Sequence, residues 1–290
     1  MDIIVDQTDL PSHTLADAWN AIKLPTQIRE RLLAHSLLAL QLRSKFPFES
    51  IPVHGLILLS GPPGTGKTTL ARGLANKTAE AVKSRKARFI QVDPHALASA
   101  ALGRSQKEVT KLFHHVIPEY AADHLCIVLL DEVETLAPDR RQLSMESNPF
   151  DIHRATDAAL AGIDLLTRKH RNVLLLATTN FPEAVDPALL SRADWKEDMP
   201  LPDPEVRAEI ITDVLEHLAK EWTRLRDLKR HIGAFVDASE GLDGRQLRKA
   251  IVSAAASSVE TARDLNKLKA EHILATLRTI TAGRPTVEVA

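Results

Sequence analysis

The feature that most constrains this chain is the segment GPPGTGKT at residues 61–68. It fits the pattern G-x-x-x-x-G-K-[ST], in which glycines let backbone N–H groups turn toward phosphate oxygens. The apolar run GLILLS precedes the segment and a helical pattern follows it. Because a phosphate-binding loop needs this strand–loop–helix context, the sequence favours such a loop over a chance glycine turn.

In this loop Lys67 is predicted to reach the outer phosphates, and the hydroxyl of Thr68 is predicted to hold Mg²⁺. ATP and Mg²⁺ are therefore the expected cofactors. The residues predicted to contact the nucleotide are Gly61, Pro62, Pro63, Gly64, Thr65, Gly66, Lys67, Thr68 and Thr69.

A second motif, CIVLLDE at residues 126–132, is an apolar strand that ends in two acids. Asp131 is predicted to coordinate Mg²⁺ through water, and Glu132 to orient and polarise the attacking water. The alternative is a strand that ends in a solvated acidic turn, but the phosphate loop on the same sheet favours the catalytic interpretation. Glu134 is expected on a helix surface, and Cys126 is expected to be a buried small residue.

Short apolar runs alternate with longer helical stretches before Pro200, and only helical patterns follow it. This alternation predicts an α/β fold with a doubly wound parallel sheet. The predicted strands are Leu56–Ser60, Arg88–Val92, Ile127–Leu130, Val173–Thr178 and a fifth at Lys196–Met199. The predicted helices are Arg29–Arg43, Thr68–Val82, Lys107–Val116, Ile152–Leu166 and one that begins at Asp203 and Pro204.

These patterns predict three parts: a helical segment at residues 1–50, an α/β ATPase domain at 51–202 and a helical lid domain at 203–290. Lys and Arg number 37 and Asp and Glu 38, so no net charge favours nucleic acid or a membrane as the default partner. A single cysteine excludes an internal disulfide. With no leader and no membrane-length apolar run, the expected location is the cytoplasm.

The two motifs together resemble those of the AAA+ ATPases, and further segments fit that family. LLLATTN at 174–180 resembles the sensor-1 strand, which implies that Asn180 positions the lytic water, although it could instead cap a turn. ALLSRADW at 188–195 resembles the stretch that carries the arginine finger, which implies this role for Arg192. Trp195 stands where many members carry a second arginine.

Two further assignments depend on the resemblance. GLDGRQLRKAI at 241–251 resembles the sensor-2 motif, which implies that Arg245 reaches the γ-phosphate, whereas without the family it reads as an ordinary helix-start arginine. WNAIKL at 19–24 lies where AAA+ chains wrap the adenine, so Ile22 is the candidate contact. Helix packing is an equal alternative for Trp19 and Ile22.

Within AAA+ proteins the chain is similar to the pachytene-checkpoint ATPases, which remodel HORMA-domain proteins. The similar stretches include LLDEVETLAPDR, NPFDIHRATDAALAGID and SRADWKEDMPLP, and the resemblance covers about residues 50–255. It implies a homohexamer that opens a HORMA-domain client, alone or bound to a nucleotidyltransferase. With about 50 residues before the first strand, the chain resembles the short bacterial members of antiphage second-messenger operons.

The central pore loop of this family usually presents aromatic residues, whereas the matching segment here is Ser99–Gly103, with Ala101 and Leu102 as the candidate client contacts. A second pore loop is expected within 139–151, where Arg140 and Arg141 could contact a client or belong to a solvated loop. The alternative function is a nucleic-acid AAA+ ATPase, such as a helicase loader or transposition helper. A nucleotide-gated scaffold without turnover is disfavoured by the full set of predicted catalytic residues.

Overall fold

A computed structural model describes residues 3–83, 86–93, 97, 105–141 and 149–283 of the chain. Its contacts divide the chain into two compact units. The first comprises Met1–Ile22, Thr26–Gly61 and Lys67–Met199, and the second comprises Lys23–Pro25, Pro62–Gly66 and Pro200–Ala290.

Within the described residues, the first unit contains a six-stranded sheet with the order β1-β3-β4-β5-β2-β6. All neighbouring strands run parallel except β1, which pairs antiparallel with β3. The predicted doubly wound parallel sheet is therefore confirmed. The strands are β1 (Ile4–Leu10), β2 (Leu56–Ser60), β3 (Ala87–Val92), β4 (Leu125–Leu130), β5 (Val173–Thr179) and β6 (Trp195–Asp198).

The three central strands β4, β5 and β2 are buried along their whole length, which explains why their sequences are continuous apolar runs. Because they are parallel, their carboxyl ends meet at one edge of the sheet. The phosphate loop follows β2, the two acids follow β4, and Asn180 follows β5. The topology thus brings three predicted motifs to the same edge.

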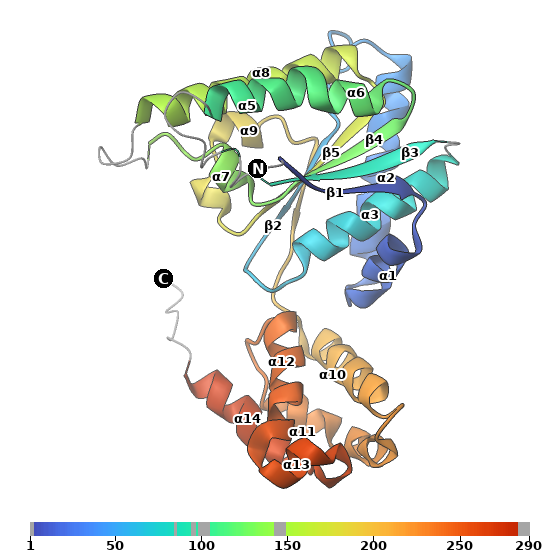
Figure 1. Ribbon diagram of the computed structural model, residues 1–290, viewed down its shortest axis with the longest axis vertical. Helices are drawn as coiled ribbons and strands as arrows, with labels where there is room; N and C mark the ends of the chain where they lie inside the picture. Colours follow the sequence, from blue (N-terminus) through green and yellow to red (C-terminus); the bar gives the residue numbers. More distant parts are fainter. Residues whose placement is uncertain (1–2, 84–85, 94–96, 98–104, 142–148, 284–290) are drawn as a thin grey trace. The chain divides into compact units, whose positions relative to one another are not determined.

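Helices cover both faces of this sheet (Figure 1), with α1, α2 and α3 on one face and α5, α6 and α8 on the other. The core under α8 includes Leu58, Val128 and Leu175 of the strands and Phe113 and Ile163 of the helices. The helices of the unit are α1 (His13–Ala21), α2 (Thr26–Lys45), α3 (Lys67–Val82), α5 (Ser105–Lys111), α6 (Ile117–Ala121), α7 (Val133–Leu136), α8 (Pro149–Lys169) and α9 (Pro187–Leu190).

The prediction of a helical N-terminal segment is wrong for its first part. Ile4–Leu10 forms strand β1, which pairs with β3 from Asp6 opposite Gln91 to Leu10 opposite Ala87, with a register shift between Ile4 and Asp6. Its residues alternate between exposed and more buried positions, which is the two-residue period of an edge strand. The segment therefore forms one edge strand of the sheet, next to β3.

One predicted helix also differs in detail. The stretch predicted as a single helix at Lys107–Val116 is α5 followed by a π-helical turn, η1, at Leu112–Val116. Phe113 in this turn packs against α8, where a Cβ on Gly162 would lie 2.4 Å from the Phe113 Cβ. Close packing at Gly162 therefore accompanies the irregular turn.

The second unit is helical beyond Pro200 and has its own core, which includes Ile211, Phe235, Leu247 and Leu277. Its first helix begins as predicted, because the Asp203 side chain accepts a hydrogen bond from the N–H of Val206 at 2.8 Å. The helices are α10 (Pro204–Leu218), η3 (Thr223–His231), α11 (Ile232–Asp237), α12 (Gly244–Ala254), α13 (Val259–Arg263) and α14 (Ala270–Ala282). No helix among the described residues is long and apolar enough to cross a membrane.

Candidate functional site

The phosphate loop leaves the end of β2 with a turn that only glycine accommodates. Gly61 has φ 133°, and a Cβ on it would lie 2.3 Å from the carbonyl oxygen of Met199. Lys67 begins α3 and is 6% exposed, and its Nζ donates a hydrogen bond to the Gly61 carbonyl at 2.7 Å. The ammonium group is therefore held over the start of the loop.

The middle of the loop, Pro62–Gly66, belongs to the second unit together with α12. Gly64 has φ 81°, and a Cβ on it would lie 2.3 Å from the carboxyl carbon of Asp243. Asp243 is the N-cap of α12 and forms a capping box with Gln246. Arg245 is the second residue of this helix, so the predicted sensor-2 arginine lies on the helix whose N-cap contacts the loop.

The two residues predicted to hold Mg²⁺ are in contact. The hydroxyl of Thr68 donates to Oδ1 of Asp131 at 2.8 Å. Mg²⁺ prefers such hard oxygen ligands and commonly takes only one or two from protein, with phosphates and water supplying the others. The oxygens of Thr68 and Asp131 therefore fit a metal that a nucleotide also binds. Among the described residues there is no group of three or more His, Cys, Asp or Glu that could hold a metal.

The next acid, Glu132, stands in a left-handed conformation with φ 52° at the start of α7. Its Oε1 accepts a hydrogen bond from the side-chain amide of Asn180 at 3.3 Å. The structure therefore brings the predicted base and the predicted sensor-1 residue together. Such a pair can orient a water molecule that binds beside both groups.

The expectation that Glu134 lies on a helix surface is wrong. Its Oε1 accepts the backbone N–H of Asn180 at 3.1 Å, and its Oε2 is buried without a hydrogen-bond partner among the described residues. Glu132 and Glu134 thus contact the two ends of the same asparagine. The spacing D-E-x-E is the sequence signal for this arrangement, because the short α7 turns both glutamates toward the end of β5.

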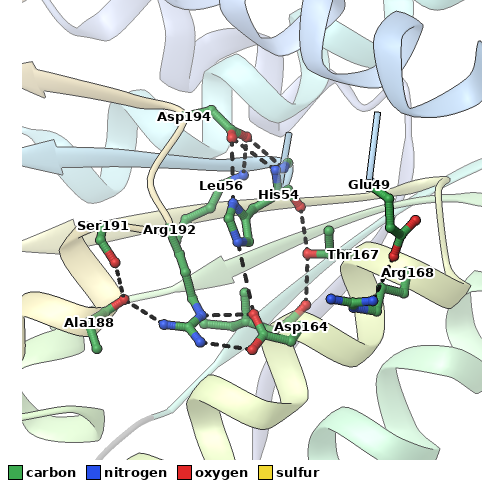
Figure 2. Close-up of polar contacts among 12 residues, drawn as sticks. Glu49, His54, Leu56, Asp164, Thr167, Arg168, Ala188, Ser191, Arg192 and Asp194 are labelled. Carbon is green, nitrogen blue, oxygen red and sulfur yellow. Dashed lines mark hydrogen bonds and ion pairs between the residues drawn. The ribbon is translucent and has the colours of Figure 1, made fainter. Parts of the chain in front are cut away.

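Arg192, the predicted arginine finger, pairs with Asp164 of α8 (Figure 2). Its Nε and Nη2 contact the two carboxylate oxygens, each at 2.8 Å, and Nη1 donates to the carbonyl of Ala188 at 2.8 Å. The hydrogen bond lowers the pKa of Asp164 and raises that of Arg192. Sequence reasoning did not find Asp164, whose only signal is a charged residue among the apolar positions of α8.

Asp194, two residues further on, anchors the same segment to the start of β2. Its carboxylate accepts the backbone N–H groups of His54, Gly55 and Leu56 at 2.9, 2.6 and 3.0 Å. The His54 ring lies 3.9 Å from both Asp164 and Asp194, as Figure 2 shows. Burial is the main cause that lowers the pKa of His54 below its ordinary value, and the two carboxylates oppose this shift.

Trp195 does not provide a second finger. Its ring stacks on His35 with centroids 3.9 Å apart, and its Nε1 donates to Glu197 at 2.8 Å. The side chain is therefore tied to α2 and β6. The assignment of a single arginine finger, Arg192, stays a prediction.

The predicted adenine contact lies at the end of α1, where the Ile22 carbonyl accepts a hydrogen bond from Arg29. Trp19 is 9% exposed and packs against α3, where a Cβ on Gly73 would lie 2.5 Å from the Trp19 Cα. Helix packing therefore accounts for Trp19, while the role of Ile22 stays a prediction. The pore-loop candidates Ala101 and Leu102 lie outside the described residues.

The basic pair expected in a second pore loop is held by acids. Arg140 contacts Asp186 at 2.8 Å and Asp157 at 2.6 Å, while Arg141 contacts Asp139 at 2.9 Å. Asp186 is 5% exposed and caps α9, so Arg140 links the turn before Arg192 to α8. Residues 142–148 of this predicted loop lie outside the described part of the chain.

Comparisons with known proteins agree with this geometry. The profile of the ATPase family associated with various cellular activities (AAA) matches residues 57–201. CD-NTase-associated protein 6 of Pseudomonas aeruginosa is 45% identical over 271 residues, which are 93% of this chain and 89% of that protein. The pachytene checkpoint protein 2 homolog of Xenopus tropicalis is 32% identical over 83% of this chain and 61% of its own length.

Solved structures show the same fold. Caenorhabditis elegans PCH-2 superposes with a TM-score of 0.77 and 25% identity, over 97% of this chain and 77% of that one. A chain of the HORMA:CdnC:Trip13 complex of Escherichia coli MS115-1 has a TM-score of 0.76 at 17% identity, over 94% of both chains. Given the phosphate loop, the acids after β4 and these similarities, the chain belongs to the AAA family of nucleotide-binding ATPases, in the group of CD-NTase-associated protein 6 and pachytene checkpoint protein 2.

Proposed function

We propose that this protein hydrolyses ATP to remodel a HORMA-domain protein, and that it thereby regulates bacterial antiphage second-messenger signalling. The observation that carries the proposal is the similarity to CD-NTase-associated protein 6 along nearly the whole chain. The E. coli structure of the same fold contains a HORMA protein and CdnC together with the Trip13 chain. This supports a HORMA-domain client, free or bound to a nucleotidyltransferase, for the present chain as well.

We base the catalytic roles on the residues that lie at the carboxyl edge of the sheet. Lys67 and the loop N–H groups bind the phosphates, and Thr68 and Asp131 would hold Mg²⁺. The metal, when bound, neutralises charge on the phosphate oxygens. Glu132 accepts a proton from the attacking water, whose position Asn180 fixes through its amide.

The proposal assigns two arginines to the charge that develops on the γ-phosphate. Arg245 reaches the nucleotide of its own chain from α12, and Arg192 reaches the nucleotide of a neighbouring subunit in a homohexamer. A finger stabilises transition-state charge without taking part in bond formation. Three of the guanidinium hydrogen bonds hold Arg192 on α8 and Ala188, so its position is defined before any neighbour binds.

The test is ATP turnover of the purified chain with a purified HORMA-domain protein, with single-stranded DNA and with double-stranded DNA. The proposal expects stimulation by the HORMA protein and conversion of that protein between its closed and open states. Glu132→Gln serves as the matched control, because it keeps the fold and loses the base. Stimulation by DNA alone would support the nucleic-acid alternative and contradict the proposal.

Client grip is assigned to Ala101 and Leu102, and a separate variant tests it. Leucine buries apolar surface worth about 1.5–3 kcal/mol when fully covered, and a ring presents several copies at once. Leu102→Asp should therefore lose client remodelling and keep basal ATP turnover. Remodelling at the parental rate would show that this segment does not grip the client.

A further inference from the structure

Thr178 of β5 lies between the two catalytic acids at the end of β4. It is 2% exposed, and its hydroxyl donates a hydrogen bond to Oδ1 of Asp131. The same hydroxyl accepts the backbone N–H of Glu132 at 3.1 Å. Since a hydroxyl offers one donor and two acceptor sites, a single side chain serves both acids at once.

Both acids depend on this contact for their positions. Oδ1 of Asp131 receives two hydroxyls, Thr68 from the phosphate loop side and Thr178 from β5. The carboxylate is therefore held by one hydroxyl from helix α3 and one from strand β5, with Thr178 as the buried donor. Thr68 is the residue whose hydroxyl is predicted to hold Mg²⁺.

Glu132 has φ 52°, a conformation that is unfavourable for a non-glycine residue and persists only where its surroundings hold it. The Thr178 hydroxyl holds its N–H, and the Asn180 amide contacts its carboxylate. The turn that aims the Glu132 side chain at Asn180 is thus pinned at its backbone by Thr178.

We infer that Thr178 is a positioning residue of the ATPase site, whose one hydroxyl fixes the metal-binding acid and the water-activating acid relative to each other. The inference rests on the proposed roles of Asp131 and Glu132. A role in packing alone predicts otherwise, because valine is also β-branched and is likewise favoured in strands. A structural threonine would tolerate Thr178→Val, whereas a positioning threonine requires the hydroxyl.

The experiment compares Thr178→Val with Thr178→Ser in the full chain. Losing a group that orients metal ligands typically costs about 10- to 100-fold in activity or metal affinity, so we expect a loss of this size in kcat for the valine variant. The serine variant should recover most of the turnover. Thr156→Val is the matched control, because Thr156 is equally buried and its hydroxyl donates within α8 to Ile152 at 3.0 Å.

A second readout does not depend on turnover. The affinity for a fluorescent ADP is measured with Mg²⁺ and with EDTA. Thr178→Val should lose much of the affinity gained from Mg²⁺ and keep the affinity in EDTA, which depends on the loop and Lys67. Thr178→Ser and Thr156→Val should keep both.

These readouts separate the inference from the proposed function. If parent and Glu132→Gln turn over equally, the proposed roles fail, while the Mg²⁺ dependence still tests Thr178. Should Thr178→Val fail to fold, Thr178→Cys replaces it, since a thiol is a weak donor and acceptor, and its turnover should fall below that of Thr178→Ser. Parental turnover and Mg²⁺ dependence in Thr178→Val, or equal values in the cysteine and serine variants, would overturn the inference.

Discussion

Two polar clusters of the first unit are held in different ways. At the end of β4, Asp131 accepts hydrogen bonds from the hydroxyls of Thr68 and Thr178, while Glu132 accepts one from the amide of Asn180 and donates its N–H to Thr178. The cluster around Arg192 is held mainly by charge, through its bidentate pair with Asp164 and the Asp194 carboxylate on the β2 backbone (Figure 2).

The difference indicates that the two clusters have different roles. The hydroxyls of Thr68 and Thr178 and the amide of Asn180 fix the two acids with uncharged groups. The carboxylate of Asp164 fixes the guanidinium of Arg192 in space. Its negative charge also partly offsets the positive charge that Arg192 would present to a phosphate. We therefore propose that the first cluster is complete for its own nucleotide, whereas the second serves the nucleotide of a neighbouring subunit.

The largest effect is expected at Arg192. A finger contributes about 10³–10⁵ in rate, so Arg192→Ala should lose turnover by that factor while it binds ATP with similar affinity. Arg168→Ala is the matched control, because Arg168 also lies on the α8 side and pairs with exposed Glu49 at 2.7 Å. Equal turnover in the two variants would show that Arg192 has no catalytic role that distinguishes its cluster from an ordinary ion pair.

Glu132→Gln tests the first cluster. General bases contribute about 10²–10⁴ in rate, so turnover should fall by that factor while bound ATP accumulates. The amide keeps the shape of the side chain and its contact with Asn180. Steady-state turnover and nucleotide retention are measured on the same sample. Near-normal turnover would show that Glu132 is an acid that follows a strand and not the general base.

Much of this arrangement could be predicted because the residues that form it lie in short, continuous motifs. The apolar runs predicted the central strands, and the acids and Asn180 directly follow two of them, so parallel pairing brings them together. Contacts between distant residues were not predictable. Asp164 pairs with Arg192 across 28 positions, and nothing near either residue specifies the partner.

The same reasoning explains the errors at the N-terminus and at Glu134. Strand β1 is an edge strand of seven residues whose alternation becomes meaningful only when β3 lies beside it. Glu134 was assigned by its polarity, which favours solvent, whereas the backbone N–H of Asn180 provides it with a buried partner.

The charged cluster should also contribute more to stability than an exposed ion pair. Asp194→Ala removes the acceptor of three backbone N–H groups, and leaving a buried donor unpaired costs about 1–3 kcal/mol. Asp9→Ala removes an exposed pair with Arg88 and should cost at most about 1 kcal/mol. Urea unfolding of both variants measures the difference, and equal losses would mean that Asp194 does not anchor the segment.

The smallest expected effect is a pH dependence at His54, which faces Asp164, Asp194, Arg192 and Arg43. Burial lowers the pKa of the folded ring below the ordinary 6.5, so below that pH the unfolded chain binds the proton more readily. The free energy of unfolding should therefore fall as pH drops below 6.5 and level off below the folded pKa. His54→Asn should flatten this part of the curve, and an unchanged slope would contradict the assignment.

The most direct test of the two-cluster account is a mixing experiment with Arg192→Ala and Lys67→Ala chains. The first keeps its own nucleotide site and lacks the finger, while the second lacks the phosphate-binding lysine and keeps the finger. If each cluster serves a different subunit, mixed oligomers should recover ATP turnover that neither variant has alone. Mixed oligomers that form, as shown by co-purification of two tags, but recover no turnover would contradict the account.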